Sequence, residues 1–289
     1  WLVGSEMCIR DRLYTDPNIW VMECADVFKE GEYWYLTYSD VADRKVHYRY
    51  AKSLKGPWTK PANDIFDGIA FYAGKTMSNG TERYLAGWCP TRIGDGDEDQ
   101  WGGSLVCHRM LFNADGTIDL KLPDGIDKKF TTLKKTVLID KSGKAVKKED
   151  SYVLSDVASV SFPRLDKTCK IEATVKATGN DDAFGFAFGA CDDKTEVYSI
   201  RFDLKNKQLV MSKDDLTRGT TPTQTNVALT VPADKLFKVK IVAEKSVCVM
   251  YVNDKIAFSN RIDKMPKNPW AIFTDKGTEI SFSDIKVYE

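Results

Sequence analysis

The sequence predicts an all-β protein in which part of a β-propeller precedes a β-sandwich. Short segments of alternating apolar and polar residues fill the chain, and turn-forming residues separate them. Between residues 22 and 123 these segments come in two groups of four, and after residue 151 many short segments follow at regular spacing. The 289 residues also suffice for two domains at the usual length of about 150 residues each.

The composition excludes several classes of partner and cofactor. The 42 Lys and Arg residues balance the 42 Asp and Glu residues, so the chain has no general attraction for nucleic acid or for an anionic membrane. No apolar run approaches the roughly 18 residues that a membrane-spanning helix needs. The seven Cys lack CxxC spacing, and only His47 and His108 offer imidazole ligands. We therefore predict no metal and no cofactor.

The first twelve residues, "WLVGSEMCIRDR", differ from the rest of the chain. They lack the apolar segment of a signal peptide. The codons that fit residues 6–11 resemble a transposon-end adapter used in sequencing libraries. We interpret residues 1–12 as a scar of that origin rather than a native strand, which implies that the natural protein continues upstream and that any signal peptide lies there.

Residues 13–125 are predicted to form the propeller part. The first group of strands is "MECADVF", "YWYLTYS", "KVHYRYAKS" and "GPWTKP", and the second is "FYAGKTMS", "ERYLAGWCP", "WGGSLVCHRMLF" and "GTIDLKLP". The pair Tyr35-Leu36 recurs 49 residues later (35 to 84) as Tyr84-Leu85. Four strands in about 40 to 50 residues are typical of a propeller blade. Because two blades cannot close a ring, further blades are expected upstream.

Residues 126–150 are rich in Lys and Asp and are predicted to be a connector, and residues 151–289 are predicted to form the sandwich. The sandwich strands alternate cleanly, so one face of each is expected to be buried. The apolar positions of four such strands are Ile171, Ala173, Val175 and Ala177; Phe184, Phe186 and Phe188; Tyr198, Ile200, Phe202 and Leu204; and Phe237, Val239 and Ile241. Trp270 is expected in the core rather than in a sugar site.

The pair Glu23-Cys24 by itself predicts only a structural or surface carboxylate, but its context is informative. "WVMECADVF", "FDGIAFYAGKT", "YLAGW" and "WGGSLVCHRMLFNADGTIDLKLP" follow one another in an order and spacing that resemble the second half of glycoside hydrolase family 32. That family contains invertases, levanases and inulinases. "VCVMYVNDKIAFSNRI" resembles its late sandwich strands, so the likeness covers residues 13–289.

The resemblance implies a five-bladed propeller, of which this chain carries about the last two blades, joined to the sandwich. It also implies a substrate with β-fructofuranosidic bonds, either a fructan or a sucrose-like carbohydrate. Two departures indicate a divergent branch: Ala25 replaces the usual Pro after the Glu-Cys pair, and "VCHRML" replaces a common Pro-Arg-Glu-Leu pattern. The identity of the fructoside and the choice between exo and endo cleavage stay open.

The resemblance also assigns site residues. Glu23 matches the general acid/base of a mechanism that retains configuration, in which a second carboxyl group about 5 Å away acts as nucleophile. Tyr72 of "FYA" is implied to support the carboxylate pair by hydrogen bonding, and Trp88 of "GW" to form an apolar wall of the sugar pocket. From the residues alone, Tyr72 and Trp88 would be core aromatics. Cys24 is expected to point away from Glu23 and to pack beneath the site.

The nucleophile has no convincing candidate in the chain. "YTDPNIW" is similar to the family's Asn-Asp-Pro-Asn motif, but Asp16 precedes Glu23 by only seven residues (16 to 23), whereas the family's nucleophile lies on the first blade. We expect Asp16 to begin an Asp-Pro-Asn turn. Arg10-Asp11 imitates the family's Arg-Asp-Pro motif but lies in the scar. The chain is therefore expected to be an inactive fragment of a hydrolase.

Two other functions remain open: a non-catalytic carbohydrate-binding protein, and an arabinan-cleaving propeller glycosidase with inverting chemistry, in which the carboxyls are about 6.5 to 9.5 Å apart. "GDGDEDQ" at 94–100 is expected to be a solvated loop rather than a calcium site. His47 and His108 lie in predicted strands, without the Gly-x-Ser-x-Gly motif of a serine hydrolase. Export of polymer-degrading relatives favours a secreted or periplasmic location over a cytoplasmic one.

Overall fold

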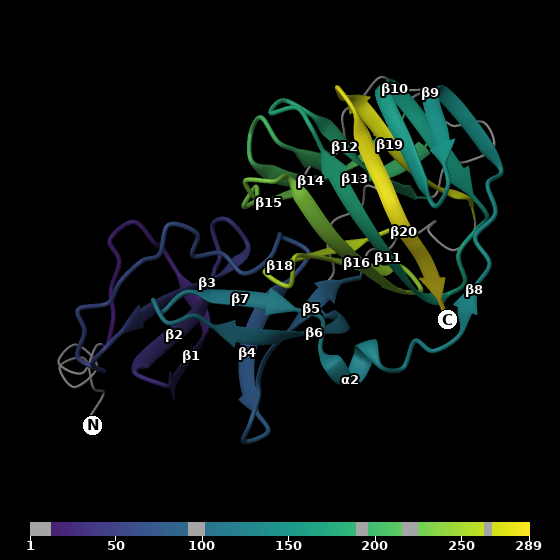
Figure 1. Ribbon diagram of the computed structural model, residues 1–289. Helices are drawn as coiled ribbons and strands as arrows, with labels where there is room; N and C mark the ends of the chain where they lie inside the picture. The colour runs from purple at the N-terminus through teal and green to yellow at the C-terminus, as the bar shows by residue number, and fades with distance from the viewer. Residues whose placement is uncertain (1–12, 92–101, 189–195, 216–224, 263–267) are drawn as a thin grey trace, which may run out of the picture.

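The computed structural model describes residues 13–91, 102–188, 196–215, 225–262 and 268–289, and strands dominate these ranges. Two small sheets lie on one side of the molecule and a large folded sheet on the other (Figure 1). The predicted all-β class is confirmed. Within the described ranges, no helix has the length and apolar character needed to cross a membrane.

The first blade is a three-stranded antiparallel sheet of β1 (Met22–Glu30), β2 (Tyr33–Asp40) and β3 (Lys45–Ala51). The prediction of a fourth strand at "GPWTKP" is wrong, because this segment makes only an isolated bridge between Thr59 and Tyr50. Pro57 and Pro61 flank that bridge, and a proline has no backbone N–H to donate to a strand ladder.

The second blade contains the four predicted strands, in the order β4 (Tyr72–Ser78), β5 (Arg83–Pro90), β6 (Gly103–Phe112) and β7 (Ile118–Lys121). Each strand pairs antiparallel with the next one along the chain. The short helix α2 (Asp124–Asp127) follows directly. The repeat seen in the sequence therefore corresponds to two successive sheets of similar build.

The sandwich is one path of hydrogen-bonded strands in the order β15-β14-β13-β12-β19-β10-β20-β11-β16-β17-β18. Strand β10 joins its two layers, because residues 151–154 pair with β20 and residues 158–162 pair with β19. The bounds are β10 (Ser151–Phe162), β11 (Thr168–Ala177), β12 (Ala183–Phe188), β13 (Glu196–Asp203), β14 (Gln208–Asp215), β15 (Thr225–Ala228), β16 (Leu236–Glu244), β17 (Val247–Val252), β18 (Ile256–Arg261), β19 (Trp270–Lys276) and β20 (Ile280–Tyr288).

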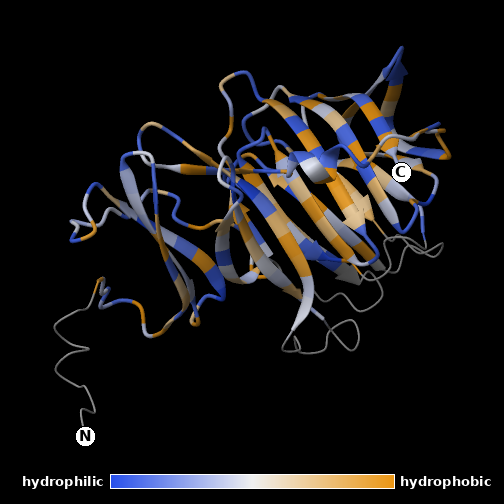
Figure 2. Cartoon of the chain, turned by 90° about the horizontal axis from the view of Figure 1, so that it is seen from below, coloured by the Kyte–Doolittle hydropathy of each residue, from blue (hydrophilic) through white to orange (hydrophobic). Residues whose placement is uncertain are grey.

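The core of the sandwich confirms the alternation read from the sequence. The apolar residues predicted to face inward on β11, β12, β13 and β16 are all buried. Figure 2 shows alternating hydrophilic and hydrophobic stripes along strands of the larger sheet. Trp270 is 2% exposed and stacks on Phe162 with ring centroids 4.6 Å apart, which confirms its predicted core position.

The stretch predicted to be a connector, residues 126–150, contains two strands that belong to the sandwich. β8 (Leu133–Lys134) pairs with β20, and β9 (Asp140–Lys148) pairs with β10 along its whole length. Most β9 side chains are exposed, so the strand lacks the alternation by which strands are recognised. Its backbone pairing with β10 explains why a Lys-rich segment is ordered here, while the domain limits themselves stay a prediction.

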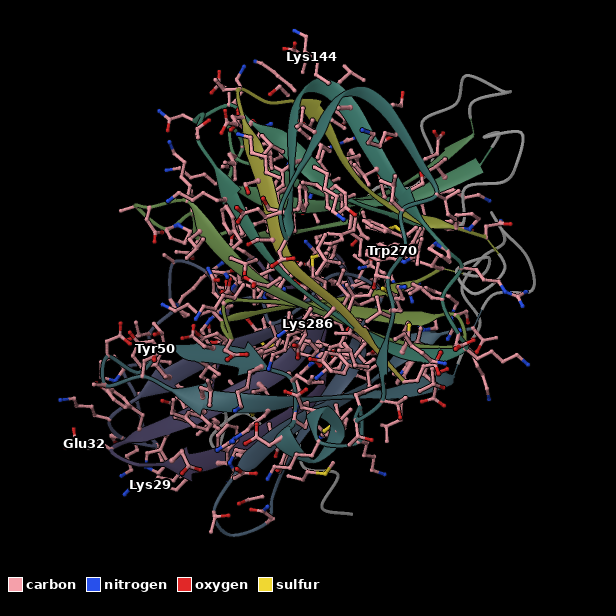
Figure 3. The ribbon with its side chains drawn as sticks, turned by 45° about the vertical axis from the view of Figure 1, so that its right-hand side comes forward. Lys29, Glu32, Tyr50, Lys144, Trp270 and Lys286 are labelled. Atoms are coloured by element: carbon pink, nitrogen blue, oxygen red, sulfur yellow. The ribbon has the colours of Figure 1, made fainter. Side chains whose placement is uncertain are left out.

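The blades pack directly on the sandwich. Val249, Tyr251 and Ala257 of β17 and β18 belong to the same buried cluster as the apolar residues of both blades. The backbone N–H of Leu120 in β7 donates to the carbonyl of Lys255 at 2.9 Å. Figure 3 shows Lys29 and Glu32 at the blade end of the molecule and Lys144 at the far end of the sandwich.

Candidate active site

Glu23 and Tyr72 occupy the same position in the two blades. They are 49 residues apart, which is the offset of the sequence repeat, and each lies at the start of the first strand of its sheet. Each is followed by a residue with positive φ, Cys24 at 53° and Ala73 at 55°. The strand register shifts directly after each of them, so both strands contain a β-bulge. A bulge of this kind changes the direction in which a side chain points.

The two bulges bring the predicted site residues together. The hydroxyl of Tyr72 donates a hydrogen bond of 2.8 Å to Oε2 of Glu23. Trp88 is the cross-strand partner of Tyr72 in β5, and its ring lies 5.8 Å from the Tyr72 ring at an angle of 83°. Glu23 and Trp88 are half-buried and Tyr72 is 4% exposed. All three therefore form one cluster with an accessible carboxylate.

The environment keeps the Tyr72 phenol protonated. Burial raises the pKa of Tyr72 well above its usual range, and the hydrogen bond to Glu23 and the charge of that carboxylate raise it further. Tyr72 is therefore a permanent hydrogen-bond donor at neutral pH. A fixed donor of this kind holds a carboxylate in one orientation.

Arg44 is a neighbour of the site that the sequence did not reveal. It lies in the turn between β2 and β3 with φ at 57°, and its guanidinium carbon is 5.6 Å from the centroid of the Tyr72 ring. This is the geometry of a cation–π contact. Nothing in the motifs pointed to Arg44, whereas the 49-residue repeat was a signal that Glu23 and Tyr72 occupy equivalent positions.

The expectation for Cys24 is wrong. Its side chain is exposed and does not pack beneath the site. The reason is the bulge: Cys24 is the positive-φ residue, so the simple alternation of strand side chains that placed it in the core does not apply.

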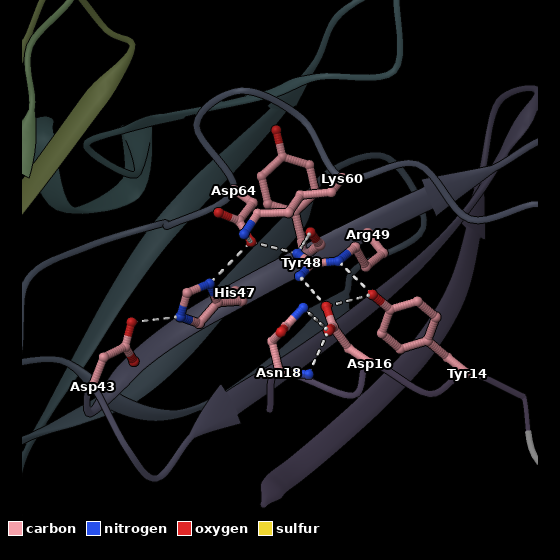
Figure 4. Close-up of polar contacts among 9 residues, drawn as sticks. All are labelled: Tyr14, Asp16, Asn18, Asp43, His47, Tyr48, Arg49, Lys60 and Asp64. Atoms are coloured by element: carbon pink, nitrogen blue, oxygen red, sulfur yellow. Dashed lines mark hydrogen bonds and ion pairs between the residues drawn. The ribbon is translucent and has the colours of Figure 1, made fainter. Parts of the chain in front are cut away.

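A second polar cluster lies on the first blade (Figure 4). Nδ1 of His47 is 3.0 Å from Oδ2 of Asp64, and Nε2 of His47 is 2.9 Å from Oδ2 of Asp43. Burial opposes a charge on this imidazole, but the bonds to both carboxylates outweigh it and raise the pKa of His47 to about 9. Burial likewise opposes the charge on Asp64, and the hydrogen bonds from His47 and Arg49 lower the pKa of Asp64 to about 2.

The N-terminal segment is fixed to this cluster. Oδ1 of Asp16 accepts a hydrogen bond from the backbone N–H of Asn18 at 3.0 Å, which confirms the predicted turn. Nη2 of Arg49 lies 3.6 Å from Oδ2 of Asp16, and Nε of Arg49 donates to the hydroxyl of Tyr14 at 2.9 Å. Asp16 is therefore occupied by a turn and by an ion pair.

Asp40, Asp43 and His47 place their ligand atoms within 4.8 Å of one another, as a metal site requires. A metal needs a free lone pair on an imidazole nitrogen. Both nitrogens of His47 lie at hydrogen-bond distance from carboxylate oxygens, Nδ1 from Asp64 and Nε2 from Asp43. In the described part of the chain, this group is accordingly better explained as an ion-pair cluster than as a metal site.

His108 forms a buried hydrogen-bond network with a carboxylate and a hydroxyl. Its Nε2 is 3.1 Å from Oδ2 of Asp67, and its Nδ1 is 3.0 Å from the hydroxyl of Tyr251. His108 and Asp67 are both 0% exposed, so this network holds the second blade on the sandwich and is inaccessible to substrate. The loop at 94–100 and the segment 1–12 lie outside the described residues.

The solved structures with a similar fold include a β-fructofuranosidase, a fructosyltransferase and an exo-inulinase. The chain is similar to a β-fructofuranosidase of Aspergillus kawachii (14% identity, TM-score 0.68), covering 93% of this chain and 57% of that one. It is similar to a fructosyltransferase of A. japonicus (14%, TM-score 0.67; 93% and 56%) and to an exo-inulinase of Aspergillus awamori (14%, TM-score 0.65; 93% and 56%). The chain thus spans little more than half the length of these neighbours.

No curated protein sequence matches this chain. The model of one protein family does match: it describes the C-terminal domain of the BT1760-like branch of family GH32, and it covers residues 116–287. This range includes β7 of the second blade and the sandwich strands up to Val287 of β20. The chain therefore belongs to glycoside hydrolase family 32.

Proposed function

We propose that Glu23 is the general acid/base of an enzyme that hydrolyses β-fructofuranosidic bonds in sucrose or fructans. The observation that carries this proposal is the 2.8 Å hydrogen bond between Tyr72 and Glu23, beside Trp88, in a chain of this family. A secreted or periplasmic location goes with this function as a prediction from the relatives.

The chemistry assigns each residue a step. The oxygen of the departing sugar is a poor leaving group until it is protonated, and a neutral Glu23 carboxyl group supplies that proton. The resulting carboxylate then takes a proton from the water that attacks the fructosyl intermediate. Tyr72 holds the carboxyl group in one orientation by its hydrogen bond. Trp88 offers an apolar surface to the ring of the sugar.

A retaining mechanism also needs a nucleophilic carboxylate about 5 Å from the acid/base. Asp16 is unsuited to this role because it caps a turn and pairs with Arg49. The proposal therefore places the nucleophile upstream of residue 13. On this basis the isolated chain does not hydrolyse fructosides, although it contains the acid/base.

The acid/base role is tested in a form of the enzyme that includes the upstream blades. Glu23→Gln is expected to lower kcat on sucrose or levan by about 10² to 10⁴-fold. The loss should be much smaller in the fructosyl-transfer step of an aryl β-fructofuranoside, because a nitrophenolate leaves without a proton. Added azide should restore turnover of that substrate by attacking the intermediate in place of activated water. Equal losses on both substrates, with no effect of azide, would contradict the role.

The isolated chain provides a separate test. It is incubated with sucrose, inulin and levan, and released reducing sugar is measured. No turnover is expected. Turnover abolished by Glu23→Gln would show that the chain supplies its own nucleophile. Saturable binding of a fructan without hydrolysis, both in this chain and in the form with the upstream blades, would instead favour a carbohydrate-binding protein.

A further inference from the structure

The bulges that carry Glu23 and Tyr72 belong to different sheets. β1 pairs only with β2, and β4 pairs only with β5, so no strand ladder connects β1 to β4 in the described part of the chain. The distance between the Glu23 carboxylate and the Tyr72 hydroxyl must therefore be set by side-chain contacts between the two strands.

Asp26 makes the principal contact of this kind. It follows the bulge of β1, and its Oδ2 accepts two hydrogen bonds from Thr76 of β4, one from the backbone N–H at 3.0 Å and one from the hydroxyl at 2.7 Å. In the described part of the chain β4 is an edge strand of its sheet, so backbone donors that face away from β5 need other acceptors. The Asp26 carboxylate satisfies one of them and joins the two strands at the same time.

Two further contacts reinforce this connection. Nζ of Lys75 donates to the carbonyl of Ala25, within the bulge of β1, at 2.6 Å. Nη1 of Arg83 donates to the Thr76 hydroxyl at 3.1 Å, so that hydroxyl is oriented to donate toward Asp26. Residues 25 and 26 of β1 are therefore tied to residues 75 and 76 of β4. These contacts lie two and three residues after Glu23 on β1, and three and four residues after Tyr72 on β4.

We infer that Asp26, through Thr76, is a positioning residue for the acid/base: it locks the two bulges together and thereby fixes the Glu23 carboxylate against the Tyr72 hydroxyl. The catalytic consequence rests on the proposed function, whereas the geometric one does not. Asp26 itself does not touch the reacting atoms.

The geometric part is tested in this chain by NMR with ¹³Cζ-labelled tyrosine at neutral pH. The Tyr72 signal is identified by its loss in Tyr72→Phe, and Glu23→Gln shows how far the signal moves when the phenol loses its carboxylate acceptor. Asp26→Ala and Thr76→Val should move the signal in the same direction by a comparable amount. Asp26→Asn and Thr76→Ser, which keep an acceptor and a hydroxyl, should restore most of the original shift.

The chain offers a matched control in the β6–β7 hairpin. Oδ1 of Asp115 accepts from the backbone N–H of Thr117 at 2.9 Å and from its hydroxyl at 2.6 Å, which is the same chemical arrangement away from the site. Asp115→Ala should leave the Tyr72 signal unmoved. A Tyr72 signal that is unchanged in both Asp26→Ala and Thr76→Val, or one that does not respond to Glu23→Gln, would overturn the inference.

The catalytic part is tested in the form with the upstream blades. A misplacement of about 1 Å costs about 10²-fold in rate, so Asp26→Ala should lower kcat on sucrose by about that factor with little change in KM. An aryl fructoside should be affected much less, and Asp26→Asn should recover most of the loss. Equal losses of kcat on both substrates, with no recovery in Asp26→Asn, would indicate a merely structural role. The NMR test does not depend on whether Glu23 is the acid/base. A failure of the positioning inference can therefore be told apart from a failure of the proposed function.

Discussion

The backbone N–H of Ser259 in the sandwich donates to Oδ1 of Asp67 in the loop before the second blade, at 2.8 Å and 192 residues away in sequence. The same oxygen accepts from the N–H of Gly68 at 2.6 Å, and the other carboxylate oxygen faces Nε2 of His108. Asp67 is thus a buried junction between the two parts of the protein.

Asp67→Ala is expected to lower the free energy of unfolding by about 3 kcal/mol or more, because it leaves several buried donors without an acceptor. Tyr251→Phe removes only the hydroxyl that contacts His108 and should cost about 1 to 2 kcal/mol. Urea denaturation of both variants measures these values. If Asp67→Ala left the free energy of unfolding unchanged, the junction would not be important for stability.

His47 should make the stability of the first blade depend on pH. Its pKa is raised from 6.5 to about 9 in the folded chain, so its contribution is fully present below pH 6.5 and is lost as the pH rises through 9. The stability difference between wild type and His47→Gln should therefore be largest near pH 6 and shrink toward pH 9. Urea denaturation at several pH values checks this. A difference that does not vary with pH would show that folding leaves the pKa of His47 unchanged.

Trp270 and Trp88 should respond differently to truncation. Trp270→Ala removes a fully buried ring from the stack with Phe162 and should cost about 3 to 5 kcal/mol. Trp88 is half-buried at the candidate site, so Trp88→Ala should cost less than half of that. Thermal unfolding of both variants provides the comparison, and a similar loss for both would place Trp88 in the core.

The cysteine thiols should differ in reactivity. Cys24 is exposed, whereas Cys89, Cys169 and Cys248 are buried, and burial raises the pKa of Cys169 to about 12. Because the thiolate is the reactive form, Ellman's reagent should modify Cys24 quickly in the native chain. Cys24→Ser should remove one equivalent of fast reaction, and Cys248→Ser should remove none until denaturant is added. Loss of fast reaction in Cys248→Ser would indicate that the sandwich opens.

The sequence was sufficient for elements that follow a local period. The period-2 alternation predicted the buried positions of β11, β12, β13 and β16, because an antiparallel strand with one face in the core needs apolar residues at every second position. The 49-residue repeat predicted two successive sheets. The Glu-Cys, Phe-Tyr-Ala and Gly-Trp motifs predicted Glu23, Tyr72 and Trp88, and the fold brings these three side chains together.

Tertiary structure decided what depends on contacts between separate sheets. The exposure of Cys24 follows from the bulge of β1, and the approach of Arg44 to Tyr72 and the tie between Asp26 and Thr76 are contacts between residues of different sheets. The polar strand β9 is ordered because β10 offers a free edge. A local pattern records which face of a strand is buried, but not where the strand breaks its pleat or which distant donor meets its carboxylate, because those outcomes depend on the packing of residues far apart in the chain.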